Sequence, residues 1–388
     1  MIQFVYIFFK IIELTVFIVF GKKMSKTGVR KEYWKLSVVP ILTYSLIEGL
    51  RFGRKIDWNV YYFRYEQLGQ NVNFLDNYEP LFRYICYVLY QLGVPYPGFI
   101  FLQCLFFIIC AFVVVENFKE RCRWIIPLIL VCATGNEMFI RWFLSFSFVL
   151  LSFNSFIKRK YIYTVIWFVC AFACHSGIIV FALFFILYKF LNSCTLPPVV
   201  AVALLFVTTF VMSLNNLMFI TQITSFLSPI LGDSFSRSSY LDATENILSG
   251  TWGHVGVMEQ SKAFYYRVFL MYAPVIYWGR DLMRNYKMGY FIYNIFVIGA
   301  LCSPLFVLVE IFNRISVILT FFFCIVGGVF YFNILEKNRG NTQKVKYYLA
   351  VISLIFVIYP YFSDMFSRPD NLMLFLWNAN GRNFLPYW

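Results

Sequence analysis

Apolar runs long enough to cross, or nearly cross, a lipid bilayer recur along the whole of this 388-residue chain. A bilayer core is about 30 Å thick, so an upright spanning helix needs about 20 mainly apolar residues. The sequence therefore predicts an all-α, polytopic integral membrane protein. About twelve spans are expected, at residues 1–20, 36–50, 97–115, 123–133, 137–157, 161–173, 177–191, 196–213, 263–279, 288–309, 315–335 and 347–361.

The composition excludes a water-soluble domain of this length, because 61% of the residues are hydrophobic and only 13% are charged. A formal net charge of +14 can indicate nucleic-acid binding, but here the basic residues lie in short clusters between apolar runs. We therefore expect a single transmembrane domain over residues 1–388 and no nucleic-acid partner. The first run lacks a basic start and a cleavage site, so it is expected to be a span and not a signal peptide. The ten cysteines show neither a disulfide framework nor zinc-ligand spacing.

The basic clusters predict the orientation of the chain, since short cytoplasmic loops carry an excess of Lys and Arg. These clusters lie at residues 22–35, 119–123, 158–160, 280–287 and 337–346. If all are cytoplasmic, three segments lie on the outer side: a loop at about 51–96, a large loop at about 214–262, and a tail at about 362–388.

Two segments are too short for ordinary spans in this topology. Residues 79–93 carry apolar side chains at helical spacing on a segment of roughly 20 Å. We expect an interfacial or re-entrant helix there, on the outer side. Residues 161–191 are too long for one crossing, so two short helices are expected to turn near His175, Ser176 and Gly177.

Charged side chains within or beside spans are costly, so each is a candidate functional residue. Arg141 lies near the outer end of its run, and Glu310 and Arg314 follow each other at helical spacing. The first outer loop adds a further group: Arg51, Arg54, Asp57, Tyr61 and Glu79. Guanidinium groups bind phosphate bidentately and stay charged, whereas the two histidines, His175 and His254, lie in no metal-ligand cluster. The sequence thus predicts a metal-independent phosphate or pyrophosphate site on the outer face.

Structural interpretations of the same residues stay open. Arg51 and Arg54 could belong to a solvated loop, and Arg141 and Arg314 could bridge helices or extend to the membrane interface. Glu310 could only neutralise Arg314. His175 could be a hydrogen-bonded residue at a helix end.

Several short motifs follow one another in an order typical of a known family. They are Arg51-Phe52-Gly53 with Asp57 and Tyr61, then Glu79-Pro80-Leu81-Phe82, Ile140-Arg141, Ala173-Cys174-His175-Ser176-Gly177 and Asn313-Arg314-Ile315. In this order and spacing the chain resembles the EpsG-type group of Wzy-like bacterial exopolysaccharide and O-antigen polymerases. It departs from that group at Lys55, Trp142 and Cys174, where Gly, Gln and Phe are usual.

The resemblance implies a glycosyltransferase at the outer face of the bacterial inner membrane that needs no cofactor. A growing glycan would pass from undecaprenyl pyrophosphate to a sugar hydroxyl of the next lipid-linked repeat unit, and a flippase and a chain-length regulator would be partners. Arg51, Arg141 and Arg314 would bind pyrophosphate, with Arg54, Tyr61 and Glu310 as further substrate-binding candidates. Asp57 and Glu79 would orient Arg side chains or sugar hydroxyls, and His175 would be the general base. This scheme requires Arg51, Arg141, His175 and Arg314 to meet in one cavity.

Two other classes of function stay open. A transporter or flippase for lipid-linked oligosaccharide would also need about twelve spans and a cationic cavity, but one that both sides can reach. A membrane-bound acyltransferase would use His175 as its base and would be reachable from the cytoplasm. The clustering of charges toward one face favours the polymerase.

Overall fold

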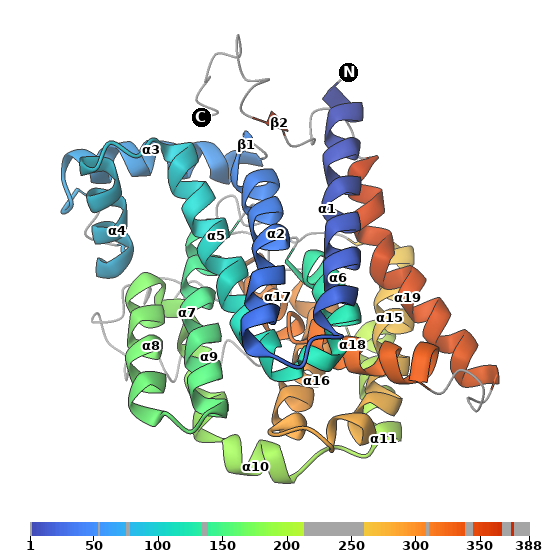
Figure 1. The fold of residues 1–388 in the computed structure, drawn as a ribbon. Helices are drawn as coiled ribbons and strands as arrows, with labels where there is room; N and C mark the ends of the chain where they lie inside the picture. The colour runs from blue at the N-terminus through green and yellow to red at the C-terminus, as the bar shows by residue number, and fades with distance from the viewer. Residues whose placement is uncertain are drawn as a thin grey trace. The chain divides into compact units, whose positions relative to one another are not determined.

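The structure is a computed structural model that describes residues 2–52, 55–74, 78–133, 139–212, 260–307, 310–337, 344–366 and 374–375 (Figure 1). The chain forms two compact units. The first comprises Met1–Leu183, Gly327–Phe332 and Ile358–Trp388, and the second Phe184–Val326 and Asn333–Val357. The described secondary-structure elements are all helices except for two strands of two residues each, so the predicted fold class is confirmed in its all-helical character.

The long helices of the first unit pack in a chain of neighbours. α1 packs on α2 and α6, α2 on α5, α5 on α7, and α7 on α8. The backbones approach closely where glycine occurs: a Cβ on Gly49 of α2 would lie 2.7 Å from the Cα of Phe101 in α5. Small residues permit such contacts between helices in lipid. These helices are α1 (Ile2–Met24), α2 (Arg30–Gly49), α5 (Tyr96–Val115), α6 (Cys122–Cys132), α7 (Ile140–Ile157) and α8 (Tyr161–Cys174).

The first predicted outer loop is mostly helical. Its predicted helix is confirmed as α4 (Pro80–Gln91), and its placement at the membrane interface stays a prediction. A second helix, α3 (Lys55–Gln70), was not expected from the sequence. α3 packs on α4 and α5 through buried Tyr65 and Leu68, and the Tyr65 ring stacks on Phe99 at 5.3 Å between centroids. α4 also contacts α8, which brings the loop onto the helical bundle.

Short strands join the first outer loop to the tail. β1 (Arg51–Phe52) pairs antiparallel with β2 (Leu374–Phe375), and Arg51 is opposite Phe375. The two segments predicted to share the outer face are therefore neighbours in the first unit.

The predicted turn inside residues 161–191 is confirmed. α8 ends at Cys174, His175 is extended (φ −160°, ψ 111°), and a 3₁₀ turn over Ser176–Ile179 leads into α9 (Val180–Ile186).

The second unit has its own packing. Asn294 of α16 donates a hydrogen bond of 2.9 Å to the Cys194 carbonyl after α10, and also contacts the Leu191 carbonyl. α15 packs on α11 and α16, and α16 on α17. The helices are α10 (Tyr188–Ser193), α11 (Pro198–Phe206), α15 (Lys262–Met283), α16 (Gly289–Phe306) and α17 (Glu310–Thr320), while α18 (Phe323–Tyr331) and α19 (Lys344–Met365) give residues to both units.

Five helical segments of the described chain are long and apolar enough to cross a membrane: Tyr96–Cys132, Ile140–Ile157, Gly289–Phe306, Phe312–Lys337 and Lys344–Ser363. The count of twelve spans is thus not confirmed. Tyr96–Cys132 contains two of the predicted runs, separated by a 3₁₀ segment (Glu116–Arg121) in which Phe118 leaves helical conformation. Tyr161–Cys174, Ser176–Ile186 and Pro198–Val211 are shorter apolar helices.

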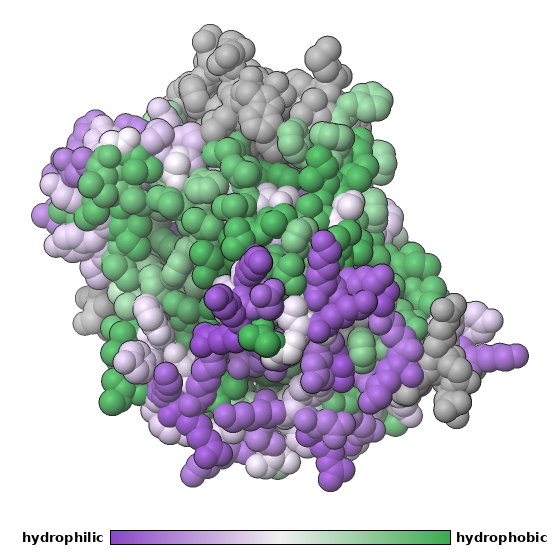
Figure 2. Space-filling model, viewed as in Figure 1, coloured by the Kyte–Doolittle hydropathy of each residue, from purple (hydrophilic) through white to green (hydrophobic). Residues whose placement is uncertain are grey.

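The surface of the first unit separates apolar helix faces from a basic turn. Figure 2 shows hydrophobic side chains along α1 and α2 and a hydrophilic patch over the turn that joins them. The patch includes the exposed Lys22, Lys23 and Lys31, whereas Phe4, Phe8 and Ile11 of α1 are exposed apolar residues. This pattern suits helices that face lipid and end at a charged membrane surface.

Candidate functional site

Arg141 forms a buried ion pair with Glu79. Arg141 is the second residue of α7, and Glu79 directly precedes α4. Arg141 Nη1 donates to Glu79 Oε2 at 2.9 Å, and the two side chains are only 4% and 6% exposed. The guanidinium carbon also lies 4.2 Å from the centre of the Tyr78 ring and 5.8 Å from that of Phe82, in cation–π contact. A buried pair of this kind is stable only if further hydrogen bonds satisfy its other polar atoms.

The second carboxylate oxygen of Glu79 reaches the turn after α8. Oε1 accepts hydrogen bonds from the Ser176 backbone N–H at 2.8 Å and from the Ser176 hydroxyl at 2.9 Å. Pro80 begins α4, and the backbone of Glu79 is extended (φ −61°, ψ 143°), as the residue before proline usually is. The hydroxyl oxygen of Tyr61 in α3 accepts a further hydrogen bond from the Arg141 guanidinium. One carboxylate thereby links the starts of α4 and α7 to the turn between α8 and α9.

His175 lies beside this link with a defined ring orientation. Its Nδ1 accepts a hydrogen bond from the Gly177 backbone N–H at 3.0 Å, and the residue is buried. The ring meets that of Trp142, the neighbour of Arg141, edge to face at 4.6 Å between centroids. Because Nδ1 accepts a hydrogen bond, the neutral ring carries its proton on Nε2. In this arrangement His175 offers a hydrogen-bond donor.

Gly177 is needed for this packing. A Cβ at position 177 would lie 2.7 Å from Cζ3 of Trp142 and 3.1 Å from Cε1 of His175. Any larger residue must displace one of the two rings. The positions of the Trp142 and His175 rings therefore depend on glycine at position 177. We call Tyr61, Glu79, Arg141, His175 and Ser176 the Glu79 cluster.

Several predicted site residues have no described side chain. Arg51 belongs to β1 and Asp57 to α3, but only their backbones are described, and Arg54 lies outside the described residues. In α3, residue 57 comes about one helical turn before Tyr61. The large loop that contains His254 also lies outside the described residues.

The predicted pair Glu310 and Arg314 belongs to the second unit. Arg314 of α17 is half-buried, and the Glu310 side chain is not among those described. Of the four residues required to meet, the structure brings Arg141 and His175 into one cluster. The convergence of Arg51 and Arg314 with them stays a prediction.

A second group of buried charges was missed by the sequence reasoning. Lys10 of α1 contacts Glu13 at 2.9 Å and also Glu48 of α2, and all three side chains are buried. The Tyr361 hydroxyl of α19 lies 2.8 Å from the Lys10 carbonyl and 3.1 Å from Glu13 Oε2. Lys10 and Glu13 are visible as charges three residues apart within the first apolar run. This group joins α1, α2 and α19 and has the features of a structural network.

The residues that could bind a metal are dispersed in the described part of the chain. No group of three or more His, Cys, Asp or Glu side chains occurs there in a metal-binding arrangement. The Glu79 cluster instead supplies a guanidinium, an imidazole N–H and hydroxyl groups, which suit anionic and hydroxylated ligands.

Comparison with protein families is decisive for the identity of the chain. The model described as "EpsG family" matches residues 34–377, nearly the whole chain. The chain belongs to the EpsG family. The match includes the whole Glu79 cluster together with Arg51 and Arg314, so the resemblance drawn from short motifs is confirmed. The EpsG family is a Wzy-like polysaccharide polymerase family. No curated protein and no solved structure matches the chain.

Family membership also agrees with the physical character of the chain. EpsG proteins are glycosyltransferase-like polymerases, and several apolar helices mark this chain as an integral membrane protein. Arg141 of the Glu79 cluster lies at the start of one candidate span, Ile140–Ile157.

Proposed function

We propose that this EpsG-family chain joins oligosaccharide repeat units carried on undecaprenyl pyrophosphate into a surface polysaccharide, an exopolysaccharide or O-antigen. The reaction takes place at the outer face of the bacterial inner membrane. One observation carries the proposal: Glu79, from the first predicted outer loop, binds Arg141 and the backbone next to His175 in a buried cluster. Three motifs far apart in sequence converge there, and each contributes a group suited to pyrophosphate or sugar.

The reaction breaks the bond between the anomeric carbon of the growing glycan and the pyrophosphate oxygen. A hydroxyl oxygen of the acceptor sugar forms the new bond to that carbon, and the electron pair of the broken bond leaves with the pyrophosphate. Fixed positive and donor groups that face this developing charge lower the barrier. We assign this role to Arg141 and to the Nε2–H of His175. Because side chains supply the positive charge, the proposed mechanism requires no metal.

The proton of the acceptor hydroxyl needs a base, and the hydrogen-bond pattern disfavours His175. To accept a proton at Nε2, the ring would have to carry its own proton on Nδ1, which would then face the Gly177 N–H. Glu79 is also a poor base, since both its oxygens accept hydrogen bonds. We assign the base role to Asp57, the other catalytic carboxylate predicted for the first outer loop, which comes about one helical turn before Tyr61. Glu79 is then a positioning residue.

The other basic residues complete the proposal. Arg51, Arg54 and Arg314 stay further pyrophosphate-binding candidates, and Glu310 a further substrate-binding candidate. A flippase is an expected partner, because the substrate must cross the membrane before it is joined. A regulator of chain length is the second expected partner.

Polymer length in cells tests the proposal. Arg141→Ala and Arg314→Ala should abolish long-chain polysaccharide while single repeat units accumulate on the lipid carrier. Polymer is compared per amount of folded protein, because Arg141→Ala leaves the Glu79 carboxylate buried without its ion-pair partner and also lowers stability. Lys158→Ala, an exposed basic residue at the other end of α7, is the matched control and should leave chain length unchanged. Long chains in both arginine variants would overturn the proposal.

Orientation is tested separately by cysteine labelling. In a chain with Cys194, the exposed native cysteine, replaced by serine, Phe74→Cys should react with a membrane-impermeant thiol reagent from outside the cell. Lys158→Cys should react only after the membrane is opened. The reverse pattern would place the Glu79 cluster on the cytoplasmic side and favour an acyltransferase.

A further inference from the structure

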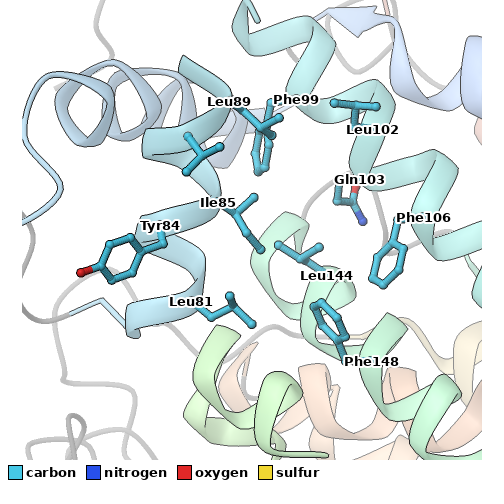
Figure 3. A pocket seen from close by; sticks show the side chains of 11 residues that line it. Leu81, Tyr84, Ile85, Leu89, Phe99, Leu102, Gln103, Phe106, Leu144 and Phe148 are labelled. Atoms are coloured by element: carbon cyan, nitrogen blue, oxygen red, sulfur yellow. The ribbon is translucent and has the colours of Figure 1, made fainter. Parts of the chain in front are cut away.

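An apolar groove lies between α4, α5 and α7 of the first unit. Its volume is about 510 Å³. Figure 3 shows Leu81 and Ile85 of α4, Leu102 of α5, and Leu144 and Phe148 of α7 around it. The lining is apolar apart from Gln103 and the ring hydroxyl of Tyr84, so the groove suits hydrocarbon and not a sugar.

The groove continues from the Glu79 cluster along two helices. Leu144 and Phe148 follow Arg141 at three and seven residues on α7, and therefore lie on its face of the helix. Leu81 follows Glu79 by two residues at the start of α4. Phe82, in contact with the Arg141 guanidinium, also packs on Phe99 of the lining at 6.2 Å between ring centroids. The charged, hydrogen-bonding Glu79 cluster and the apolar groove thus lie along the same two helices, α4 and α7.

The groove can be entered from the side. Its floor residues Phe99 and Leu144 are 2% and 5% exposed, whereas its rim residues Val88 and Leu102 are 49% and 37% exposed. In a bilayer, such a rim faces lipid. A ligand that remains in the membrane could therefore place its chain in the groove without leaving the hydrocarbon layer.

We propose that this groove binds the pyrophosphate-proximal isoprene units of the polyprenyl carrier and so fixes the pyrophosphate at the Glu79 cluster. This inference rests on the proposed function and adds a location for the lipid chain. Each buried methylene or methyl group adds to affinity, so chain contacts would align the anomeric carbon with the acceptor. A prenyl pyrophosphate accounts for a groove that continues from a cluster suited to bind phosphate. A bulk phospholipid would not require that cluster.

The test is photolabelling of the purified full-length chain in nanodiscs with a sugar-free, diazirine-bearing undecaprenyl pyrophosphate. Leu102→Trp at the rim and Leu144→Trp at the floor fill the groove, and both should lower labelling at least tenfold. Val165→Trp, on a 61% exposed position of α8 outside the groove, is the matched control and should label like the wild type. A two-isoprene pyrophosphate should compete at least tenfold less well than the undecaprenyl compound.

Leu102→Trp keeps the test informative if the buried Leu144→Trp fails to fold. Equal labelling of Leu102→Trp and Val165→Trp, or equal competition by phosphatidylglycerol, would overturn the inference. Because the probe carries no sugar, labelling is separate from catalysis. Groove labelling by a preparation that forms no polymer contradicts the proposed function alone, and polymer formation without groove labelling contradicts this inference alone.

Discussion

Glu79→Gln should strongly destabilise the folded protein, although it only replaces one carboxylate oxygen with an amide nitrogen. The substitution removes the negative charge beside Arg141, while the amide oxygen can still accept from Ser176. Breaking a buried ion pair by removal of one partner costs about 3–5 kcal/mol. Retained neutral hydrogen bonds contribute about 0.5–1.5 kcal/mol each. We therefore expect a loss of about 3 kcal/mol in the free energy of unfolding, roughly a hundredfold in the folding equilibrium.

Reversible unfolding by SDS in mixed micelles measures this loss, and two further variants identify its origin. Glu116→Gln removes the partner of Arg30, whose side chain is 72% exposed, and should cost no more than about 1 kcal/mol. Combining Glu79→Gln with Arg141→Gln removes both charges, so the double variant should be about 2 kcal/mol more stable than the sum of the single effects predicts. A cost for Glu79→Gln no larger than that for Glu116→Gln, or additivity within about 0.5 kcal/mol, would refute this reasoning.

Two further predictions concern the Glu79 cluster and its support, and a third concerns the separate charge network around Lys10. Gly177→Ala should lower polymerase activity at least tenfold with little loss of abundance, because its Cβ displaces Trp142 or His175; normal activity would show that the ring positions do not matter. His175→Gln, which keeps an N–H donor, should retain part of the polymer length that His175→Ala loses, and equal loss in both would favour a base role for His175. Tyr361→Phe should reduce the free energy of unfolding by about 1–3 kcal/mol and leave activity per folded molecule unchanged, as activity assays normalised to folded protein would establish.

Sequence patterns predicted features that depend on local chemistry. The break at His175 was predictable because residues 161–191 are too long for one helix across a bilayer and contain Ser176-Gly177. The helix over Pro80–Gln91 was predictable from its apolar spacing. The family was identified from the order of short motifs.

Features that depend on tertiary contacts were not predicted. The sequence of α3 mixes polar and aromatic residues. The helix is explained by tertiary packing, through its buried residues Tyr65 and Leu68. The link from Glu79 to Ser176 joins residues 97 positions apart through a backbone N–H, which no side-chain pattern encodes. Lys10 was not predicted, because the surrounding run is apolar enough to suggest an ordinary span. Its partner Glu48 lies on another helix, so the ion pair depends on tertiary contact.

Polymerisation by the purified protein tests the central claim most directly. The full-length chain in nanodiscs would be supplied with a synthetic undecaprenyl pyrophosphate-linked repeat unit, and the products would be separated by length. We predict a ladder of two or more repeat units for the wild type and for Lys158→Ala, and only the single unit for Arg141→Ala. A folded wild-type chain that leaves the repeat unit unjoined, or an Arg141→Ala chain that produces the same ladder, would contradict the account.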